Sequence, residues 1–282
     1  MNKMTPILDP DREFINKWEM YKLLTLHSLK NIEIPETRLF TKDSLASMLT
    51  DYPLVYIKSI ATWGGKDIST VHKNGSFFEW TIQGKEALTF KNFEETYKQI
   101  DQFYHDKITI IQRGIPAIRY NGRPFDIRSH LYREMDGSWI YAGDLIRIGG
   151  EGSLVSNIGI SNGSVKPTDE LIALLFPNQN HHFTKDILKN VSLEICKMLD
   201  KFHFFTEVGL DFALDQNGNL WIIEVNTDDL KGCPDLELFS LLPDQSVYER
   251  IMNQKAKIYD NWIQFMIHSF DDYLKEKAKE QD

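Results

Sequence analysis

The segment LDFALDQNGNLWIIEVN, residues 210–226, consists of two apolar runs joined at Asn217-Gly218. Asn-Gly between apolar runs is typical of a β-hairpin with a two-residue type I′ turn. This turn predicts a register in which Asp211 lies directly opposite Glu224. Asn226 follows Glu224 by two residues and therefore lies on the same face of the sheet. Two facing carboxylates repel each other, so this arrangement of acids lowers the stability of the hairpin.

A bound divalent cation would explain this arrangement. Mg²⁺ prefers hard oxygen ligands in octahedral geometry, usually one or two carboxylates together with phosphate oxygens. Asp211, Glu224 and the amide oxygen of Asn226 form such a ligand set on one face. The alternative is a surface hairpin in which the acids are solvated or the register differs by one residue. Both acids lie within strongly apolar strands, which indicates partial burial and favours a cation.

Length and composition limit the class of protein. The chain has 282 residues, of which 42% are hydrophobic, so it can bury the core of one large domain or two smaller lobes. The net charge of −9 is spread along the chain without a dense Lys/Arg cluster, which argues against nucleic-acid binding. Cys196 and Cys233 form neither a CxxC motif nor a disulfide framework. The N-terminus lacks a signal-peptide apolar region and no window approaches about 18 apolar residues, so we expect a cytoplasmic protein without a membrane span.

Strands and helices alternate in blocks that hairpins connect. This order predicts an α+β fold with antiparallel sheets rather than a doubly wound βαβ fold. Pro35 disfavours helix before it, so residues 34–40 are expected to form an extended linker. Helices are predicted at residues 11–30, 42–51, 91–105, 184–202 and 244–281. Strands are predicted at residues 53–60 and within 68–82, 107–148 and 210–226, with a loop at 61–67 and a Gly/Ser-rich loop at 149–165.

A lysine and a glycine loop are the candidates for binding phosphate. Nothing in the chain matches GxxxxGK[ST] or a strand–GxGxxG–helix, so neither a P-loop nor a Rossmann site is indicated. Lys58 lies in an apolar strand, where its ammonium must be paired or solvated. The following Gly64-Gly65 loop, between two strands, has the composition to cover phosphates with backbone N–H groups. The alternative is an edge-strand lysine beside an ordinary turn, and these residues alone leave both interpretations open.

The sequence PFDIRSH places Asp126 and Arg128 on one face of a strand. If Asp136-Gly137 forms a two-residue turn, Arg147 falls directly opposite Asp126. One interpretation is a structural cross-strand ion pair, worth about 0.2–1 kcal/mol. The other is that Arg128 and Arg147 hold the negative charge that develops on a transferred phosphoryl group or an acyl phosphate. The arrangement favours the functional interpretation.

Taken in order, these features resemble the ATP-grasp superfamily over roughly residues 12–230. The order is the lysine strand, the glycine loop, IIQRGI, DIR, a later arginine, SN, and then D…EVN. The likeness is closest to the ATP-grasp family associated with bacterial endospore coats, through NKW, GRPFDIR, GSWIYAG, SLVSN and WIIEVN. The DIR…SN…EVN series is also similar to ligases that add glutamate to the C-terminus of a ribosomal protein.

The resemblance implies an ATP-grasp fold in which two lobes with antiparallel sheets enclose ATP. An N-terminal helix and linker (residues 1–41) would precede a lid lobe (42–111) and a core lobe with a C-terminal helix (112–282). It also implies a role for each matching residue. Lys58 would bind the nucleotide phosphates, and Gly64 and Gly65 would form the lid. Gln112 through Ile115 would contact adenine, largely through the backbone, and Asp126 would lie near the ribose or the nucleotide. Arg128 and Arg147 would bind the transferred phosphate, and Asn157 would lie by the phosphates. The Mg²⁺ would be held by Asp211, Glu224 and Asn226.

The activity that the resemblance implies is an ATP- and Mg²⁺-dependent, ADP-forming carboxylate–amine ligase. It would act through an acyl phosphate on peptide or small-molecule carboxylate and amine substrates. One alternative is a kinase of the same fold that phosphorylates a hydroxyl. A second alternative, from another class, is a non-catalytic spore-coat or interaction protein. The resemblance also predicts that the protein, although cytoplasmic, is associated with spores.

Two departures from the family pattern lead to further expectations. EVN is usually followed by a small residue and a proline, whereas here Asp228 and Asp229 follow, and these acids are expected to affect substrate choice or bind a cationic acceptor. Only about fifty residues precede Lys58, too few for a separate upstream substrate domain. We therefore expect a second subunit or a long peptide to complete the acceptor site. A homodimer would form most simply through the aromatic helix near Trp262.

Overall fold

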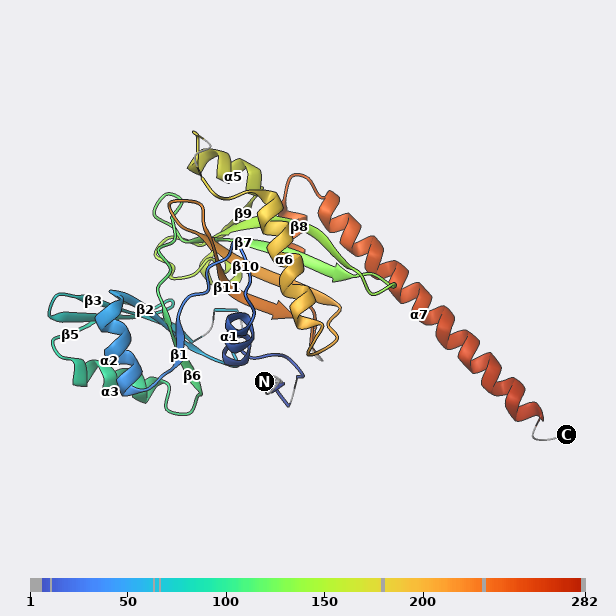
Figure 1. Cartoon of the computed structure of the whole chain (residues 1–282), viewed down its shortest axis with the longest axis horizontal. Helices are drawn as coiled ribbons and strands as arrows, with labels where there is room; N and C mark the ends of the chain where they lie inside the picture. The colour runs from blue at the N-terminus through green and yellow to red at the C-terminus, as the bar shows by residue number, and fades with distance from the viewer. Residues whose placement is uncertain are drawn as a thin grey trace.

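The computed structural model describes residues 7–10, 12–62, 64–65, 67–178, 181–229 and 232–279, without the side chains of residues 262, 265 and 269–279. Within these residues the chain forms two antiparallel sheets, each with helices packed against it (Figure 1). The predicted α+β fold with antiparallel sheets is therefore confirmed. No helix among the described residues combines the length and the apolar character needed to cross a membrane.

The first sheet has the strand order β1-β6-β2-β3-β4-β5. Helices α2 (Lys42–Asp51) and α3 (Phe93–Phe103) pack on it, and Leu45, Met48 and Ile100 are fully buried in the shared core. The residues predicted as a linker supply the edge strand of this sheet. The sheet therefore extends beyond the predicted lid lobe, residues 42–111. The division into lobes remains a prediction. The strands are β1 (Thr37–Leu39), β2 (Leu54–Ser59), β3 (Ile68–Asn74), β4 (Phe77–Ile82), β5 (Leu88–Phe90) and β6 (Thr109–Arg113).

The second sheet has the order β11-β10-β7-β8-β9. Its strands are β7 (Phe125–Arg133), β8 (Trp139–Ile148), β9 (Ser164–Lys166), β10 (Glu207–Leu214) and β11 (Leu220–Thr227). One face packs on α1 (Lys17–Leu26), α5 (Thr168–Leu175) and α6 (Lys185–Leu199), through alternate residues such as Ile127 and Leu210. The intervening residues, among them Arg128 and Asp211, point to the opposite face.

The remaining elements lie around the second sheet. A short helix, α4 (Ile158–Ser161), forms within the predicted Gly/Ser-rich loop, and the 3₁₀ helix η1 (Glu237–Leu241) follows β11. Helix α7 (Ser246–Lys279) packs on β8 and η1 at its start and then extends away from the body of the protein (Figure 1). The predicted helix 11–30 is shorter than expected, because the side chain of Asn16 accepts hydrogen bonds from Trp18 N and Glu19 N and starts α1 at Lys17.

The hairpin register at Asp211 is as predicted, but the predicted turn is wrong. Asp211 faces Glu224, whereas Leu214 faces Leu220, and a bulge after Asp211 accounts for the shift of one residue. The loop is three residues long, with Gly218 at φ +76° and Asp215 N bonded to Asn219 O. Oδ1 of Asp215 accepts from the backbone N–H groups of Asn217 and Asn219 and so holds this longer loop. The bulge then restores the register beyond it.

The β7–β8 hairpin repeats this pair of compensating features. Asp126 faces Arg147 as predicted, but the turn is again three residues long, because Glu134 N bonds to Ser138 O. Oδ1 of Asp136 accepts from Ser138 N at 2.8 Å, and Gly137 has φ +86°. A register shift between His130 and Leu131 compensates for the longer turn. The two-residue turn predicted at Asp136-Gly137 is therefore wrong, although the pairing of Asp126 with Arg147 is right.

Candidate active site

A cavity of about 180 Å³ lies between the two sheets. Apart from Arg113 and Gly114 of the predicted adenine segment, the lining includes the residues predicted for the nucleotide and the metal: Lys58, Gly64, Gly65, Gln112, Ile115, Asp126, Arg128, Arg147, Asn157, Asp211, Glu224 and Asn226. These residues come from β2, the glycine loop, β6 and the segment after it, β7, β8, the loop before α4, β10 and β11. The fold thus brings together residues that are far apart in the sequence, while their individual roles toward ATP remain predictions.

Asp211 is held by two arginines. Arg128 Nε donates to Oδ1 at 2.5 Å and Arg128 Nη2 donates to Oδ2 at 3.0 Å, a bidentate contact between neighbouring strands. Arg147 Nη2 lies 2.9 Å from Oδ2. Burial by itself would raise the pKa of the Asp211 carboxyl, but Arg128 and Arg147 together lower that pKa to about 2. Asp211 is therefore a charged, buried anchor for both arginines.

Asp126 is the second buried partner of Arg147. Arg147 Nε donates to Oδ1 of Asp126 at 2.7 Å, and Nη2 donates to Oδ2 at 2.6 Å. Ser156 Oγ also donates to this carboxylate. The predicted cross-strand ion pair is present, and it extends into a network because Arg147 bridges Asp126 and Asp211. This network fixes the orientation of both arginines along one wall of the cavity.

The expected repulsion between Asp211 and Glu224 is offset by basic side chains. Asp211 is paired with the two arginines, and Glu224 Oε1 lies 3.0 Å from Lys17 Nζ. Lys17 comes from the first turn of α1, more than two hundred residues away in the chain. The assumption of two uncompensated acids was therefore wrong. The protein itself supplies cations to this face.

Lys58 lies on a central strand, because β2 is between β6 and β3, so the edge-strand alternative is wrong. Its Nζ donates to Gln112 Oε1 at 2.7 Å, and Gln112 Nε2 donates to Thr37 Oγ1 at 2.9 Å. Burial lowers the pKa of Lys58 to about 8, an effect that Lys17 reinforces and Glu224 opposes. Gln112 was expected to act largely through its backbone, whereas its side chain orients the Lys58 ammonium.

The glycine loop closes toward the loop before α4. Gly64 and Gly65 have φ of +69° and +77°, a backbone conformation that favours glycine. A Cβ on Gly65 would lie 2.6 Å from Ile160 Cδ1 and 3.3 Å from Val155 Cγ2. Glycine at this position therefore permits a close approach of the glycine loop to α4 and to the loop before it. Trp63 and Lys66, in the same loop, lie outside the described residues.

The predicted Mg²⁺ ligands fit a cation that shares its coordination with phosphate. Asn226 Nδ2 donates to Asp211 Oδ2 at 3.2 Å, which directs the amide oxygen, the atom that a cation would take, away from Asp211. Glu224 is partly exposed, whereas the Asp211 oxygens already accept from both arginines and Asn226. Among the described residues, no three His, Cys, Asp or Glu side chains gather as a ligand set. Glu224 and Asn226 would thus be the accessible ligands, with Asp211 behind them and phosphate oxygens completing the shell.

Sequence reasoning missed two residues of this site. Lys17 lines the cavity and pairs with Glu224, and Ser156 lines it and binds Asp126. Lys17 belongs to the sequence NKW, in which the helix-capping Asn16 was a signal for its position. Ser156 immediately precedes Asn157 in SLVSN, so it lay within a motif already identified.

The two acids after EVN have structural partners. Asp228 accepts hydrogen bonds from Thr206 N and Oγ1 and from Glu207 N, so it holds the chain where β10 begins. Asp229 forms an ion pair with Arg12. These contacts give both carboxylates a structural role, and their expected effect on substrate choice or acceptor binding stays a prediction.

The two sheets and the lysine, arginine and acid residues between them define an ATP-grasp protein. The model of the YheC/D like ATP-grasp family matches residues 5–253, and the chain belongs to this family. The predicted superfamily and the likeness to the endospore-coat family are therefore confirmed. ATP-grasp proteins in general bind ATP and Mg²⁺ and carry out ATP-dependent reactions of the ligase or kinase type.

Two proteins of Bacillus subtilis (strain 168) are similar to the chain. Endospore coat-associated protein YheD is 24% identical over 235 residues, which cover 77% of this chain and 49% of YheD. Endospore coat-associated protein YheC is 25% identical over 243 residues, which cover 80% of this chain and 65% of YheC. The chain thus spans about half of the first relative and under two thirds of the second.

Proposed function

We propose that the protein is an ATP- and Mg²⁺-dependent carboxylate–amine ligase that acts on a peptide or protein carboxylate. A carboxylate oxygen attacks the γ-phosphorus of ATP, the bond to the β-phosphate oxygen breaks, and ADP leaves. The acyl phosphate is then attacked by an amine, which forms the amide and releases phosphate. The cation, when bound, would neutralise phosphate charge from the side of Glu224 and Asn226.

The observation that carries this proposal is the convergence of cationic groups on one cavity. Lys58 lies on the first sheet, and Arg128 and Arg147 lie on the second, with Glu224 and Asn226 beside them. The arginines are held by buried aspartates, so their charge is oriented before a ligand arrives. Phosphoryl transfer needs positioning and charge neutralisation more than a covalent side-chain intermediate. This arrangement supplies both.

The products of the reaction distinguish the kinase alternative from the proposed ligase. Purified protein would be incubated with ATP, Mg²⁺ and pools of amino acids and peptides, and both ADP and free phosphate would be measured. A ligase produces equal amounts of ADP and phosphate together with an amide. A kinase produces ADP and a phosphorylated acceptor without free phosphate. A non-catalytic protein would show no acceptor-dependent turnover, although Lys58 and the predicted metal ligands are all present.

The names of the relatives support a proposal about the cellular setting. YheD and YheC are both named endospore coat-associated proteins. We therefore propose that this protein is made in the cytoplasm and acts in association with spores. Fractionation of sporulating cells, with detection of the protein in the coat fraction, would test that assignment.

Replacing Lys58 by Ala is expected to weaken ATP binding by about tenfold to a hundredfold, the value of one charge-assisted hydrogen bond. Adenosine, which lacks phosphates, should bind almost unchanged. Calorimetric titration with a non-hydrolysable ATP analogue and with adenosine measures both affinities. Lys73→Ala, on β3 of the same sheet but outside the cavity, is the matched control. Equal losses for the two ligands would make Lys58 a structural residue.

The same residue predicts the pH dependence of binding. Because the pKa of Lys58 is about 8, the unbound protein loses this positive charge as the pH rises above that value. ATP favours the protonated form, so its affinity should fall by up to about tenfold per pH unit above the pKa. In Lys58→Ala this dependence should disappear, which the same titrations would reveal.

A homodimer through α7 is a further prediction. The exposed residues on the described part of the helix include Ile258, Tyr259, Met266 and Ile267. The interface was expected near Trp262, but the side chain of Trp262 lies outside the described residues. Light scattering during chromatography should give about twice the 32.9 kDa mass of the chain. A monomer at all concentrations, with and without candidate peptide, would contradict the prediction.

A further inference from the structure

A second, larger cavity of about 450 Å³ adjoins the first. The two cavities share the lining residues Lys17, Lys58, Gly64, Gln112, Arg128, Arg147, Asn157, Ile223, Glu224 and Asn226. These shared residues include the basic residues to which the phosphoryl transfer is assigned. Whatever occupies the larger cavity therefore meets the transferred phosphate at this junction.

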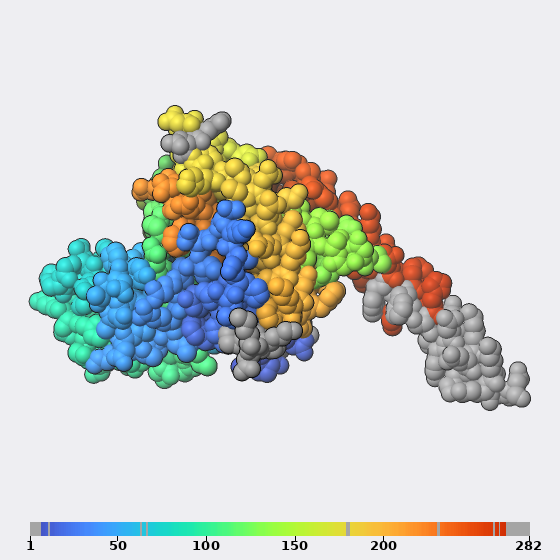
Figure 2. All heavy atoms as spheres, in the orientation of Figure 1, coloured from blue at the N-terminus to red at the C-terminus, as the bar shows by residue number. Residues whose placement is uncertain are grey.

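Helix α1 forms one wall of the larger cavity. Lys17, Met20, Tyr21 and Leu24 line it, at the spacing of one helical face. Met20 and Leu24 are also buried in the core that α1 shares with the second sheet, so this wall is part of the folded body. In the space-filling view, the blue N-terminal segment lies between the cyan first sheet and the gold α6 (Figure 2). Apart from Lys17, the α1 wall is apolar, and Arg12, Thr227, Asp229 and Asp235 contribute polar groups elsewhere in the lining. Arg12 already forms an ion pair with Asp229.

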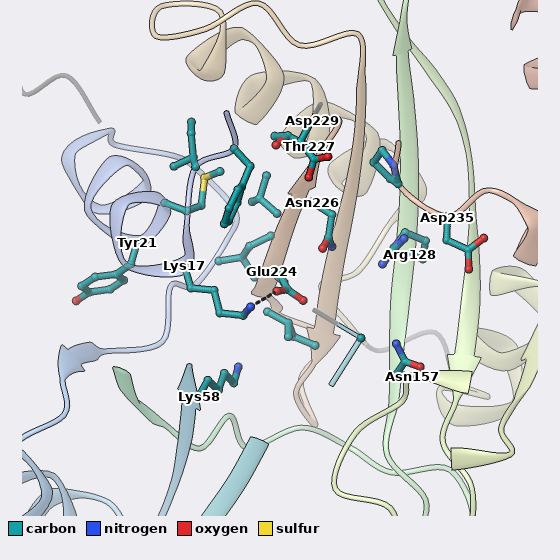
Figure 3. A pocket seen from close by; sticks show the side chains of 18 of the residues that line it. Lys17, Tyr21, Lys58, Arg128, Asn157, Glu224, Asn226, Thr227, Asp229 and Asp235 are labelled. Carbon is teal, nitrogen blue, oxygen red and sulfur yellow. Dashed lines mark ion pairs between the residues drawn. The ribbon is translucent and has the colours of Figure 1, made fainter. Parts of the chain in front are cut away.

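Lys17 lies where the two cavities meet. Its Nζ is 3.0 Å from Glu224 Oε1 (Figure 3). The same Nζ also donates to the carbonyl oxygen of Thr62, in the loop after β2. Arg128 and Arg147 are bound by paired hydrogen bonds to buried aspartates. Lys17 instead pairs with a carboxylate whose side chain is 29% exposed. A lysine ammonium has three donors on a flexible stem, so Lys17 can turn from this contact to a new anion.

We propose that the larger cavity binds the substrate that carries the carboxylate, and that Lys17 binds this carboxylate beside the transferred phosphate. This inference rests on the proposed ligase function and specifies its substrate. The size of the cavity and the apolar wall of α1 fit a peptide C-terminus with an apolar last residue better than a small acid. Lys17 holds the substrate carboxylate in place while one carboxylate oxygen forms the new bond to phosphorus.

Cys233 provides a built-in reporter of occupancy. It lines the larger cavity and is exposed, whereas the other cysteine, Cys196, is completely buried. A thiol reagent such as iodoacetamide will therefore modify Cys233 selectively. Desolvation raises the pKa of the Cys233 thiol to about 11, so its labelling is slow. The rates are compared at one fixed pH no higher than the Lys58 pKa of about 8, at which Lys58 still carries charge for the ATP analogue. A ligand that fills the cavity slows this labelling.

The experiment measures the labelling rate of Cys233 in the presence of Mg²⁺ and a non-hydrolysable ATP analogue. The probes are N-acetyl-glycyl-X dipeptides that cover the standard amino acids, with a free C-terminal carboxylate or as C-terminal amides. We expect acids with an apolar last residue to slow labelling, and the amides to have little effect. In Lys17→Met, about tenfold more acid should be required, the value of one charge-assisted hydrogen bond. Lys17→Arg, which retains the charge, should restore part of the effect.

Lys22→Met is the matched control, because Lys22 lies on α1, pairs with Glu19 and does not line either cavity. Three outcomes would each overturn the inference. Acids and amides could protect Cys233 equally, Lys17→Met could leave the protection unchanged, or no acid could protect it. The comparison of acid with amide in the unmodified protein holds even if Lys17→Met fails to fold. Binding of the ATP analogue, measured separately by calorimetry, distinguishes failure of this inference from failure of the proposed function. If the unmodified protein does not bind the analogue, the proposed function itself is wrong.

Discussion

Glu224→Gln is expected to abolish Mg²⁺-dependent ATP turnover, with a loss of about 10²–10³ in kcat, the scale for removing one preorganised electrostatic contact. The substitution removes the charge of the accessible carboxylate at the predicted cation site and preserves its shape. Its effect on folding should be within about 1 kcal/mol, because the ion pair with Lys17 is partly exposed. Coupled assays of ADP release across a Mg²⁺ titration, together with thermal unfolding, measure both quantities.

Glu170→Gln is the matched control for this variant. Glu170 also pairs with a lysine, Lys166, but the pair lies on the surface and outside the cavity. The control should therefore keep both activity and melting temperature. Full Mg²⁺-dependent turnover by Glu224→Gln would contradict the assignment of the hairpin to metal binding.

Asp211→Asn is expected to destroy activity as well, but with a large loss of stability. The repulsion predicted for the hairpin suggested that removing this charge raises the melting temperature. The structure reverses that expectation, because Asp211 neutralises two buried arginines, and breaking such pairs costs about 3–5 kcal/mol. In the folded protein the pKa of the Asp211 carboxyl is about 2, below its ordinary value of 3.8. This stabilisation is therefore present above the ordinary value and is lost as the pH falls toward 2.

Arg128→Met is expected to lower kcat by about 10² or more while the KM for ATP changes less. Arg128 lies on the cavity wall, oriented by Asp211, so it is placed to bind charge that grows in the transition state. The same change leaves Asp211 without its bidentate partner, so stability should fall by about 3 kcal/mol. Kinetics are therefore measured well below the melting temperature of the variant.

Arg133→Met separates the catalytic loss from the structural one. Arg133 is a buried arginine on the same strand and pairs with Asp200, but it is outside the lining of either cavity. It should lower the stability of the protein and leave kcat nearly unchanged. If Arg128→Met raised only KM, its role would be ordinary binding of ATP.

Periodicity in the sequence was sufficient to predict which side chains share a face. Alternation along β7 and β10 places Asp126, Arg128 and Asp211 opposite the apolar residues that face α6, because successive residues of a strand point to opposite sides. The short-range turn signals were less informative. Asn217-Gly218 and Asp136-Gly137 predict two-residue turns, yet both loops contain three residues because Asp side chains bond to the loop backbone. The predicted registers are nevertheless right at the site, since a bulge offsets each longer loop.

The sequence by itself determined the α+β class, the ATP-grasp family, the shared face of the hairpin acids and the charged residues that line the smaller cavity, except Lys17. Only the tertiary structure decided how the charges are balanced. Lys17 reaches Glu224, and Lys58 is held by Gln112 rather than exposed at an edge. The physical reason is the separation along the chain over which each effect acts. Hydrophobic periodicity and motifs are properties of neighbouring residues, whereas ion pairs between distant residues depend on how α1 and the two sheets pack against one another.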